Sequence, residues 1–593
     1  MRTVLALVCC AAVVTACAPS ASPSSAPPGE PQPARTAVAV GSGGAVVSVN
    51  PYSTQVGLDV LKAGGNAVDA AVATAAALGV VEPYSDGIGG GGYFVYYDAR
   101  ARQVRTLDGR ETAPAAMKAD SFLDPATGAK LPFDDAVNSG LSVGVPGTPA
   151  TWDRALRNWG TISLGTALDP AIRLAEQGFV VSQQFRDETA MNEQRFRAVT
   201  PTAELFLPGG QLPVVGSRFR NPDLAATFRL LARDGVSALY RGELAGDIVR
   251  TAGQPPVAPD AGRVFRPGLM QPADLAGYAV VERDPTHSSY RGVDLYGMAP
   301  SASGTTTVGE ALNILGNYQL SSADRVSALH HYLEASRIAF ADRNRWIGDP
   351  AFSAVPTAAL LAPEFGKDRA CLISPVGTLT SPVAPGDPTH PVAGCTTGAG
   401  ANPPHEGPST THLVTADRWG NLVSYTLTIE QTGGSAITVP HRGFLLNNEL
   451  TDFDFAPVAP GVPDPNLPGG GKRPRSSMSP SILLRDGKPF LVIGSPGGAT
   501  IITTVLQTLV NRLDLGMSLP DAVAAPRASQ RNAANTEAEP AFLDLPERAQ
   551  LERLGQHFVL APRAFTPAPE IGAVTALEFQ ADGRIQAVAE PTR

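Results

Sequence analysis

Cysteine is scarce in this chain, which has five in 593 residues. Three of them, Cys9, Cys10 and Cys17, lie close to the first residue, so only Cys371 and Cys395 remain for the rest of the chain. No Cys/His pair near them has the spacing of zinc ligands, so we expect no metal site. An oxidising compartment would instead permit a disulfide between Cys371 and Cys395.

Basic residues are fewer than acidic ones in this chain. Lys and Arg number 46 against 55 Asp and Glu, which gives a formal net charge of −9. There is no long basic run, so nucleic acid is excluded as the expected partner. Gly (60) and Pro (54) are abundant, and 43% of residues are hydrophobic. This composition indicates a globular protein with many turns and loops.

The first residues have the pattern of a processing signal. Arg2 precedes the apolar run VLALVCCAAVV, which is too short to span a bilayer as a helix. The sequence VTAC at 14–17 is similar to a bacterial lipobox with Cys17 as the acylated residue, and ordinary secretion is the alternative. Residues 18–35 are typical of a disordered Ser/Pro-rich tether. We therefore expect a signal peptide at 1–17 and a protein outside the cytoplasm, held by a lipid anchor or secreted.

Two glycine-rich stretches imitate nucleotide-binding loops in the wrong context. GIGGGG at 87–92 matches GxGxxG, but a helical pattern precedes it and a strand, YFVYY, follows it, the reverse of a dinucleotide site. GGGK at 469–472 has Asn466 and Arg473 where a phosphate loop needs Gly and Ser or Thr. We therefore predict no nucleotide cofactor, and a tight turn with close backbone packing at 87–92.

A hairpin is predicted after residue 409. TTHLVTA alternates like a strand, DRWGN is a turn, and LVSYTLTIEQ alternates again. A turn centred on Trp419 places Thr410 opposite Thr428 and His412 opposite Thr426, with cross-strand Cβ atoms about 5 Å apart. The period of two predicts a polar, accessible face that contains Thr426 and Thr428, and an opposite face that belongs to the core.

A second hairpin ends in a helix. SILL and PFLVIG flank the turn RDGK, and a helix is predicted from about Thr500. Gly497 and Gly498 therefore lie at a strand-to-helix junction, where backbone N–H groups favour an anion.

Several polar residues carry little information when they are considered singly. The adjacent His330 and His331 cannot share one helix face, which disfavours a metal site. A structural role explains His412 better than a catalytic pairing with a hydroxyl. Arg110 has the simpler explanation of a surface arginine beside a turn.

Six motifs taken together are much more specific: GGNAVDAAVA, LDGRETAP, TTH…DRWGN…SYTLTIEQ, GFLLNNELTDFD, KRPRSSMSPSI and GSPGGATIITTVLQ. In this order they closely resemble the gamma-glutamyltransferase family, also called glutathione hydrolases, from about residue 38 to residue 590. The resemblance implies an α+β fold, the four-layer αββα sandwich of N-terminal nucleophile (Ntn) hydrolases, with two stacked, mainly antiparallel sheets between helical layers. It implies no cofactor.

The resemblance also implies self-cleavage at the Ser409–Thr410 bond. The products would be a large subunit, 36–409, and a small catalytic subunit, 410–593, which form a heterodimer. Cleavage frees the α-amine of Thr410, whose ordinary pKa of about 7.7–8 lets it act as the base that a threonine nucleophile needs. Thr428 matches the threonine that orients this nucleophile, and Gly497 and Gly498 match the oxyanion hole.

The implied reaction cleaves γ-glutamyl amides such as glutathione and transfers the glutamyl group to water or to an amino-acid or peptide acceptor. Arg110 matches the family's clamp for the substrate α-carboxylate, a task that suits a guanidinium fork. The remaining matches are the hydroxyl donors to the same carboxylate and the acceptors for the α-ammonium: Ser476, Ser477, Glu430, Glu449 and Asp452.

Two departures from the family pattern concern the walls of the site. Residues 454–471 contain no Tyr or Trp, whereas some relatives carry an aromatic lid there, and TGGSA after TIEQ lacks an aromatic often found at that place. An Ntn acylase acting on other amides, such as glutaryl side chains, is the first alternative function. A non-catalytic, lipid-anchored binding protein is the second.

Overall fold

A computed structural model describes residues 35–390, 395, 398, 400–401, 407, 409–459, 461–563 and 567–591. The predicted signal peptide, the predicted acylation site Cys17 and all of the predicted tether except Arg35 lie outside the described residues. Within them, no helix combines the length and apolarity that crossing a membrane requires.

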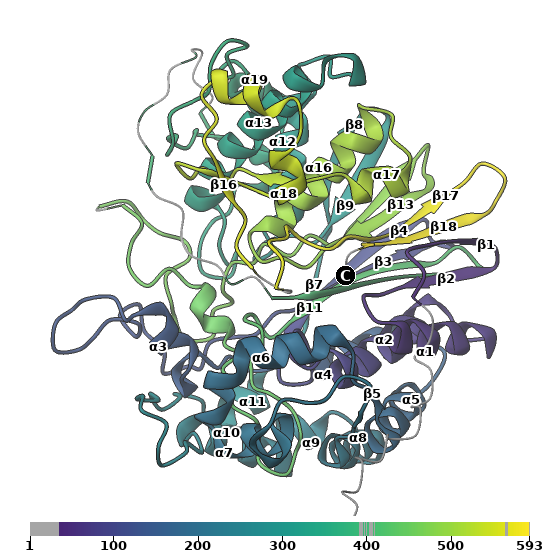
Figure 1. The fold of residues 1–593 in the computed structure, drawn as a ribbon, viewed down its shortest axis with the longest axis vertical. Coiled ribbons are helices and arrows are strands. Elements are labelled where there is room, and N and C mark those ends of the chain that lie inside the picture. The colour runs from purple at the N-terminus through teal and green to yellow at the C-terminus, as the bar shows by residue number, and fades with distance from the viewer. Residues whose placement is uncertain are drawn as a thin grey trace, which may run out of the picture.

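Two antiparallel sheets form the centre of the molecule and stack face to face (Figure 1). In spatial order, the seven-stranded sheet consists of β1 (Val38–Gly41), β18 (Ile585–Ala589), β17 (Thr575–Phe579), β13 (Lys488–Gly494), β12 (Ser481–Arg485), β9 (Val293–Gly297) and β8 (Thr286–Tyr290). The six-stranded sheet consists of β2 (Gly44–Val47), β10 (Thr411–Asp417), β11 (Leu422–Thr428), β3 (Gly91–Asp98), β4 (Gln103–Gly109) and β7 (Val281–Arg283).

Helices cover the outer face of each sheet, which completes four αββα layers (Figure 1). The layer beside the seven-stranded sheet contains α12 (Gly304–Leu315), α13 (Arg325–Trp346), α16 (Thr500–Leu513) and α17 (Leu519–Ala524). The layer beside the six-stranded sheet contains α1 (Pro51–Lys62), α2 (Ala67–Val81), α4 (Thr148–Trp159), α5 (Leu164–Gln177), α6 (Gln183–Arg197), α8 (Pro222–Asp234) and α10 (Glu243–Gly253). The predicted fold class is confirmed.

Shorter elements complete the fold. The helices are α3 (Phe133–Val137), α7 (Thr200–Phe206), α9 (Ser237–Tyr240), α11 (Pro272–Gly277), α14 (Thr357–Leu360), α15 (Pro363–Ala370), α18 (Pro540–Leu543) and α19 (Arg548–Arg553). The strands are β5 (Phe179–Val180), β6 (Arg218–Phe219), β14 (Ala528–Ser529), β15 (Thr536–Ala538) and β16 (Phe558–Leu560). A disulfide joins Cys371, which caps α15, to Cys395, with Cα atoms 5.4 Å apart.

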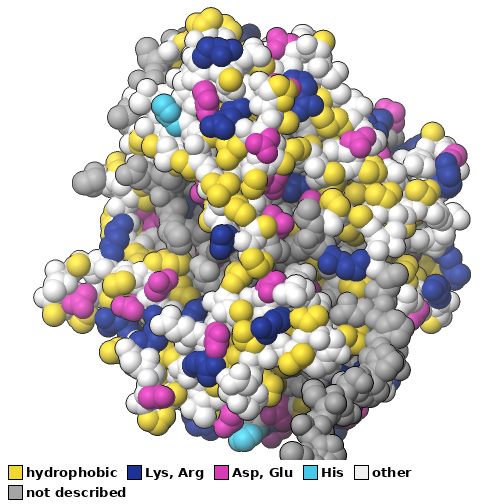
Figure 2. Space-filling model, viewed as in Figure 1, with side chains coloured by type: hydrophobic (Ala, Val, Ile, Leu, Met, Phe, Trp, Pro, Cys, Tyr) yellow, Lys and Arg dark blue, Asp and Glu magenta, His cyan; other side chains and the backbone are white. Residues whose placement is uncertain are grey.

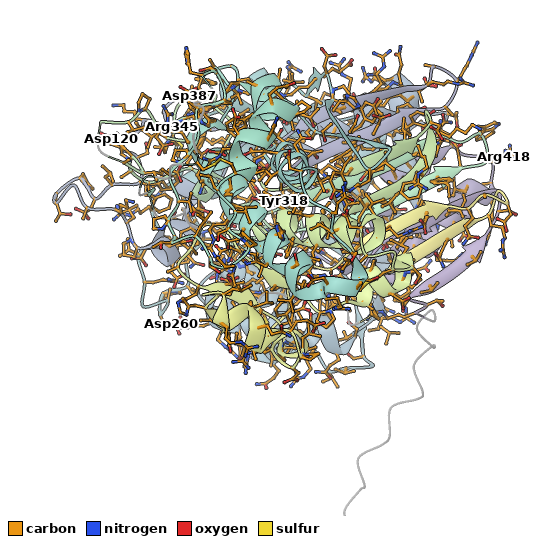
Figure 3. The ribbon with its side chains drawn as sticks, turned by 90° about the horizontal axis from the view of Figure 1, so that it is seen from above. Asp120, Asp260, Tyr318, Arg345, Asp387 and Arg418 are labelled. Carbon is orange, nitrogen blue, oxygen red and sulfur yellow. A yellow bond between two sulfur atoms is a disulfide. The ribbon has the colours of Figure 1, made fainter. Side chains whose placement is uncertain are left out.

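The hairpin β10–β11 has the predicted register. Thr411 pairs with Leu427 and His412 with Thr426, so that each residue lies opposite the one at the same distance from Trp419, as a turn centred on that residue requires. Asp417 stabilises the turn, since its carboxylate accepts the N–H groups of Trp419 and Asn421 at 2.9 and 3.0 Å. The same carboxylate accepts the N–H of Ala67 at the beginning of α2, 3.0 Å away. Figure 3 places Arg418, in this turn, at the far end of the sheets. Thr410 directly precedes the opposite end of β10 and is buried, with 3% of its surface exposed.

The polar face of β11 is buried, which corrects the prediction that it is accessible. Thr426 and Thr428 are 0% and 2% exposed. This face turns toward the seven-stranded sheet, where Ser424 Oγ donates to the carbonyl of Ile493 in β13 at 3.2 Å. Alternation distinguishes the two faces of a strand, but it does not reveal that a second sheet covers the polar one.

His412 contributes to this contact between the sheets. Its ring lies so close to Gly494 that a Cβ atom there would come within 2.3 Å of it. Nδ1 lies 2.7 Å from Thr426 Oγ1, and burial lowers the pKa of His412 to about 3. The imidazole is therefore neutral and packed, in keeping with the structural role predicted for it.

Candidate active site

The predicted site residues converge on one small cavity at the buried end of β10 and β11. All of them except Gly497 line it: Arg110, Thr410, Thr428, Glu430, Glu449, Asp452, Ser476, Ser477 and Gly498. Gly407, Ser409, Met478 and Ile501 complete the lining. The cavity is small, about 20 Å³. In the continuous chain the site is therefore assembled but too small for a molecule the size of an amino acid.

Thr410 supplies the nitrogen of the Ser409–Thr410 bond, which is predicted to break. Its hydroxyl donates to the carbonyl oxygen of Ser409. The hydroxyl of Thr428 donates to the same oxygen at 3.1 Å and lies 3.4 Å from Thr410 Oγ1. The backbone N–H of Glu430 donates to Thr428 Oγ1 at 2.8 Å, which fixes the orientation of that hydroxyl. The hydroxyls of Thr410 and Thr428 thus meet at the carbonyl of the bond that is predicted to break.

Arg110 occupies the opposite wall with its guanidinium buried. It forms ion pairs with Glu449 and Asp452, and its Nη2 also donates to the carbonyl of Arg475 at 3.1 Å. We predicted these three charged side chains as separate contacts for a substrate carboxylate and ammonium. In the uncut chain they satisfy one another instead, since a buried charge without a partner is costly.

Ser476 and Ser477 are positioned by the helical layer that covers the seven-stranded sheet. Arg343 in α13 donates to Ser477 Oγ and to Ser303 Oγ, each at 2.7 Å. Ser303 in turn donates to the carbonyl of Ser476 at 2.7 Å. Arg343 and Ser303 therefore fix the position of Ser476 and Ser477, and both of these serines line the cavity.

The predicted oxyanion glycines lie just before α16. Gly497 has φ 138° and Gly498 φ 54°, and the helix begins at Thr500, as predicted. A Cβ atom on Gly497 would come within 2.5 Å of Thr500 Oγ1, so this turn requires glycine. Gly498 and Ile501 reach the cavity, which places the positive end of the helix dipole beside it.

These geometric findings agree with comparison to known proteins. The sequence model of gamma-glutamyltranspeptidase matches residues 53–593. The glutathione hydrolase proenzyme of Bacillus subtilis (strain 168) is 40% identical over 495 residues, which cover 83% of this chain and 81% of that protein. The chain belongs to the gamma-glutamyltranspeptidase family.

Acylases are also similar to this family member. The acylase ACY 1 proenzyme of Pseudomonas sp. (strain V22) is 34% identical over 565 residues, which cover 93% of this chain and 92% of that protein. The crystal structure of cephalosporin acylase from Bacillus halodurans has a TM-score of 0.80 and 28% identity, and the match covers 95% of this chain and 97% of that one. The Ntn-hydrolase fold is thus shared by transpeptidases and acylases, so the fold alone does not select the substrate.

Sequence reasoning missed four residues that this family member places around the cavity. Asn448 donates to Glu430, and Gly407 donates to the same carboxylate. Glu111 is fully buried beside Glu449, and Arg343 holds the serine pair. Asn448 and Glu111 lie next to predicted residues in the motifs NNE and GRE, which is a usable signal. Arg343 carries no such signal, because α13 reaches the site only through tertiary packing.

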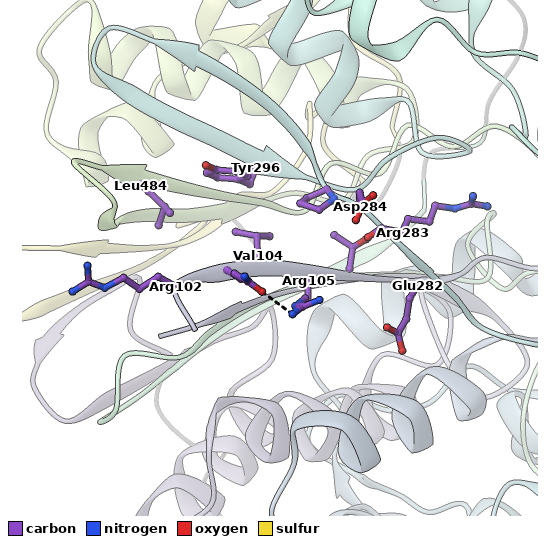
Figure 4. Close-up of a pocket in the computed structure, with 11 residues that line it drawn as sticks. Arg102, Val104, Arg105, Glu282, Arg283, Asp284, Tyr296 and Leu484 are labelled. Carbon is purple, nitrogen blue, oxygen red and sulfur yellow. Dashed lines mark hydrogen bonds between the residues drawn. The ribbon is translucent and has the colours of Figure 1, made fainter. Parts of the chain in front are cut away.

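Other cavities are separate from this site. Figure 4 shows one of about 540 Å³, where Val104 on one sheet faces Tyr296 and Leu484 on the other. None of the predicted catalytic or binding residues lines it. Figure 2 shows both signs of charge interspersed over the visible face, without a basic patch of the kind that binds nucleic acid. Among the described residues, no group of three or more His, Cys, Asp or Glu is arranged to hold a metal ion.

Burial of the acidic cluster predicts a pH-dependent stability of the uncut chain. Burial raises the pKa of Glu449 from 4.5 to about 7, although Arg110 opposes the shift. The folded protein then holds a proton that the unfolded chain releases between these pH values. The free energy of unfolding should therefore fall as pH rises from about 4.5 to about 7. Urea unfolding of the Thr410→Ala variant at several pH values measures this slope.

Glu449→Gln in the same background provides the control. An amide does not titrate, so the slope should become shallower. An unchanged slope would contradict the assignment of this proton to Glu449.

Proposed function

We propose that this chain is a self-processing γ-glutamyl hydrolase and transferase with Thr410 as its nucleophile. The proposal rests on the hydrogen bond that the Thr410 hydroxyl donates to the carbonyl oxygen of Ser409. The cavity around this bond also contains one arginine and three carboxylates: Arg110, Glu430, Glu449 and Asp452. This combination of charges fits a γ-glutamyl group, which presents both an α-carboxylate and an α-ammonium.

Self-cleavage begins with attack by Thr410 Oγ1 on the carbonyl carbon of Ser409. The C–O bond forms, the peptide C–N bond breaks, and the acyl group moves from nitrogen to oxygen as an ester. Water then hydrolyses the ester, which leaves a carboxylate on Ser409 and a free α-amine on Thr410. The hydrogen bond from Thr428 to the same carbonyl supports this step, since it stabilises negative charge as it develops on the oxygen.

The mature reaction uses the new amine as the base. It takes the proton of the Thr410 hydroxyl, which attacks the γ-carbonyl carbon of the donor, and the proton then passes to the leaving amine. Backbone N–H groups at Gly497 and Gly498 stabilise the oxyanion, for which a single lost donor typically costs about 2.7–4 kcal/mol. The glutamyl ester of Thr410 is then attacked by water or by an amine acceptor.

Recognition of the donor requires the buried ion pairs of the uncut chain to exchange partners. Arg110 takes the α-carboxylate together with the hydroxyls of Ser476 and Ser477. Glu430, Glu449 and Asp452 take the α-ammonium. The donor therefore replaces one set of buried charge pairs with another, which limits the desolvation cost of binding.

Several finer features belong to the same proposal. The subunits span 36–409 and 410–593 and remain together as a heterodimer. The acceptors are amino acids, peptides or water. The protein works outside the cytoplasm, attached through a lipid on Cys17.

N-terminal sequencing of the smaller fragment tests the proposal most directly. A fragment that starts with TTHLVTAD identifies both the cut and the nucleophile. Purified protein that stays a single chain while active would overturn it.

An Ntn acylase is the second candidate, favoured by the similarity to cephalosporin acylase. A glutaryl group has no ammonium, so it leaves the acidic cluster without a partner. Turnover of γ-glutamyl-anilide well above that of glutaryl-anilide is expected, and the reverse order would favour the acylase.

A further inference from the structure

Gly407 makes a buried contact inside the site before the chain is cut. Its backbone N–H donates to Glu430 Oε1 at 2.7 Å. Gly407 lies two residues before Ser409, on the segment that cleavage would release. The same carboxylate is the proposed acceptor for the donor's α-ammonium. The N–H of the uncut chain thus occupies a position that an N–H of the donor takes later.

The contact leaves no room for a side chain on Gly407. A Cβ atom there would lie 1.9 Å from Glu430 Oε1 and 2.5 Å from Gln431 Nε2. These separations are far below van der Waals contact, so any other residue must push the segment or the carboxylate away. The present contact between the Gly407 N–H and Glu430 therefore depends on the absence of a side chain at residue 407.

Glu430 is held rigidly on its other side. Asn448 Nδ2 donates to Glu430 Oε2, and Asn448 Oδ1 accepts the N–H of Gln431 at 3.0 Å. Glu430 adopts φ 81°, a conformation uncommon for a residue with a side chain. The carboxylate is therefore a fixed anchor for Gly407.

The anchor also connects to the bond that breaks. The backbone N–H of Glu430 donates to Thr428 Oγ1, and Thr428 donates to the carbonyl of Ser409. The segment before Thr410 is thus held at two points, Gly407 N–H and Ser409 C=O, by the end of a single strand. Two attachment points fix both the position and the direction of the scissile carbonyl.

We propose that Gly407 and Glu430 form a clamp that positions the Ser409 carbonyl for attack during self-cleavage. Glu430 then has two successive tasks, because the cut frees the end of the large subunit, so that Gly407 can leave the carboxylate to the donor's ammonium. Gly407 is a positioning residue of the first reaction only. The clamp rests on the proposed self-cleavage before Thr410, and the second task of Glu430 rests in addition on the proposed γ-glutamyl donor.

Gly407→Ala tests the clamp, with Gly398→Ala as a matched control on the same segment. Among the described residues, a Cβ atom on Gly398 would meet only Ala384 Cβ, at an ordinary 3.5 Å. We expect Gly407→Ala to slow self-cleavage about 100-fold, the scale of a misplaced reacting group, and Gly398→Ala to leave it unchanged. Denaturing gels over time after synthesis measure the rate. A folded Gly407→Ala chain that cuts at the wild-type rate would overturn the clamp.

Glu430 variants separate the two tasks and remain informative if Gly407→Ala does not fold. Glu430→Gln keeps one oxygen that can accept the Gly407 N–H, although its NH2 group then faces the donating Nδ2 of Asn448, and it loses the charge that attracts an ammonium. We expect it to cut faster than Glu430→Ala but more slowly than the wild type, while KM for γ-glutamyl-anilide rises about 100-fold. Equal cutting rates in the two variants would contradict the clamp.

The proposed function can fail on its own in this experiment. If the wild type cuts but does not turn over γ-glutamyl-anilide, the donor assignment is wrong and the clamp is unaffected. If the wild type turns over that donor and Gly407→Ala cuts normally, only the clamp is wrong.

Discussion

Replacing Thr410 with alanine should leave the protein as a single chain and lower γ-glutamyl hydrolysis by at least about 10⁴-fold. The hydroxyl that lies on the Ser409 carbonyl is the group that starts the acyl shift, and alanine has none. Without the shift no free α-amine appears, so the variant loses the nucleophile and its base together. A denaturing gel and a γ-glutamyl-anilide assay on the same preparation measure both losses.

Thr410→Ser is the matched control, because it keeps the hydroxyl and removes only a methyl group. It should still cut and still hydrolyse the donor. A Thr410→Ala protein that yields a fragment beginning at residue 410 would mean that another group breaks the bond. Thr428, whose hydroxyl is 3.1 Å from the same carbonyl, would then be the first residue to examine.

Replacing Arg110 with methionine should destabilise the uncut protein by about 3–5 kcal/mol. The guanidinium is the partner of Glu449 and Asp452, and both it and Glu449 are almost fully buried. Methionine fills most of the volume but leaves carboxylates in a low-dielectric site without a counter-charge. Urea unfolding of Arg110→Met in the Thr410→Ala background, at pH about 7.5, measures the loss without interference from cleavage.

Two further variants identify the cause of that loss. Adding Glu449→Gln to Arg110→Met removes one of the stranded charges and should restore part of the stability. Arg548→Met removes an exposed partner of Glu552 and should cost less than about 1 kcal/mol. If Arg110→Met costs no more than Arg548→Met, the buried ion pairs do not stabilise the uncut fold.

Local pattern was sufficient to predict the elements that carry the nucleophile. The alternation on both sides of DRWGN fixes the register of β10 and β11, because a turn of given centre leaves a single set of cross-strand partners. Likewise RDGK, with Asp486 and Gly487 at positive φ, fixes the second hairpin and delivers Gly498 to the site. These features depend on residues close together in the sequence.

The remaining features depend on contacts between distant segments or on the state of the chain. The polar face of β11 is covered by a sheet whose strands come from both halves of the sequence, so its burial has no local signal. The pairing of Arg110 with its neighbouring carboxylates was missed because the resemblance describes a site with donor bound. In the uncut chain no donor separates these charges, so the guanidinium of Arg110 and the carboxylates of Glu449 and Asp452 form ion pairs with one another.

The small volume of the cavity has a practical consequence for any preparation of this protein. Uncut molecules have no space for a glutamyl group, so a resin that carries a glutamyl analogue should retain only the cut ones. As a fresh sample ages, its total activity should rise in step with the number of cut molecules, while the turnover number of each active molecule stays constant. An active-site titration will therefore report a lower enzyme concentration than absorbance does until the last chain has been cut.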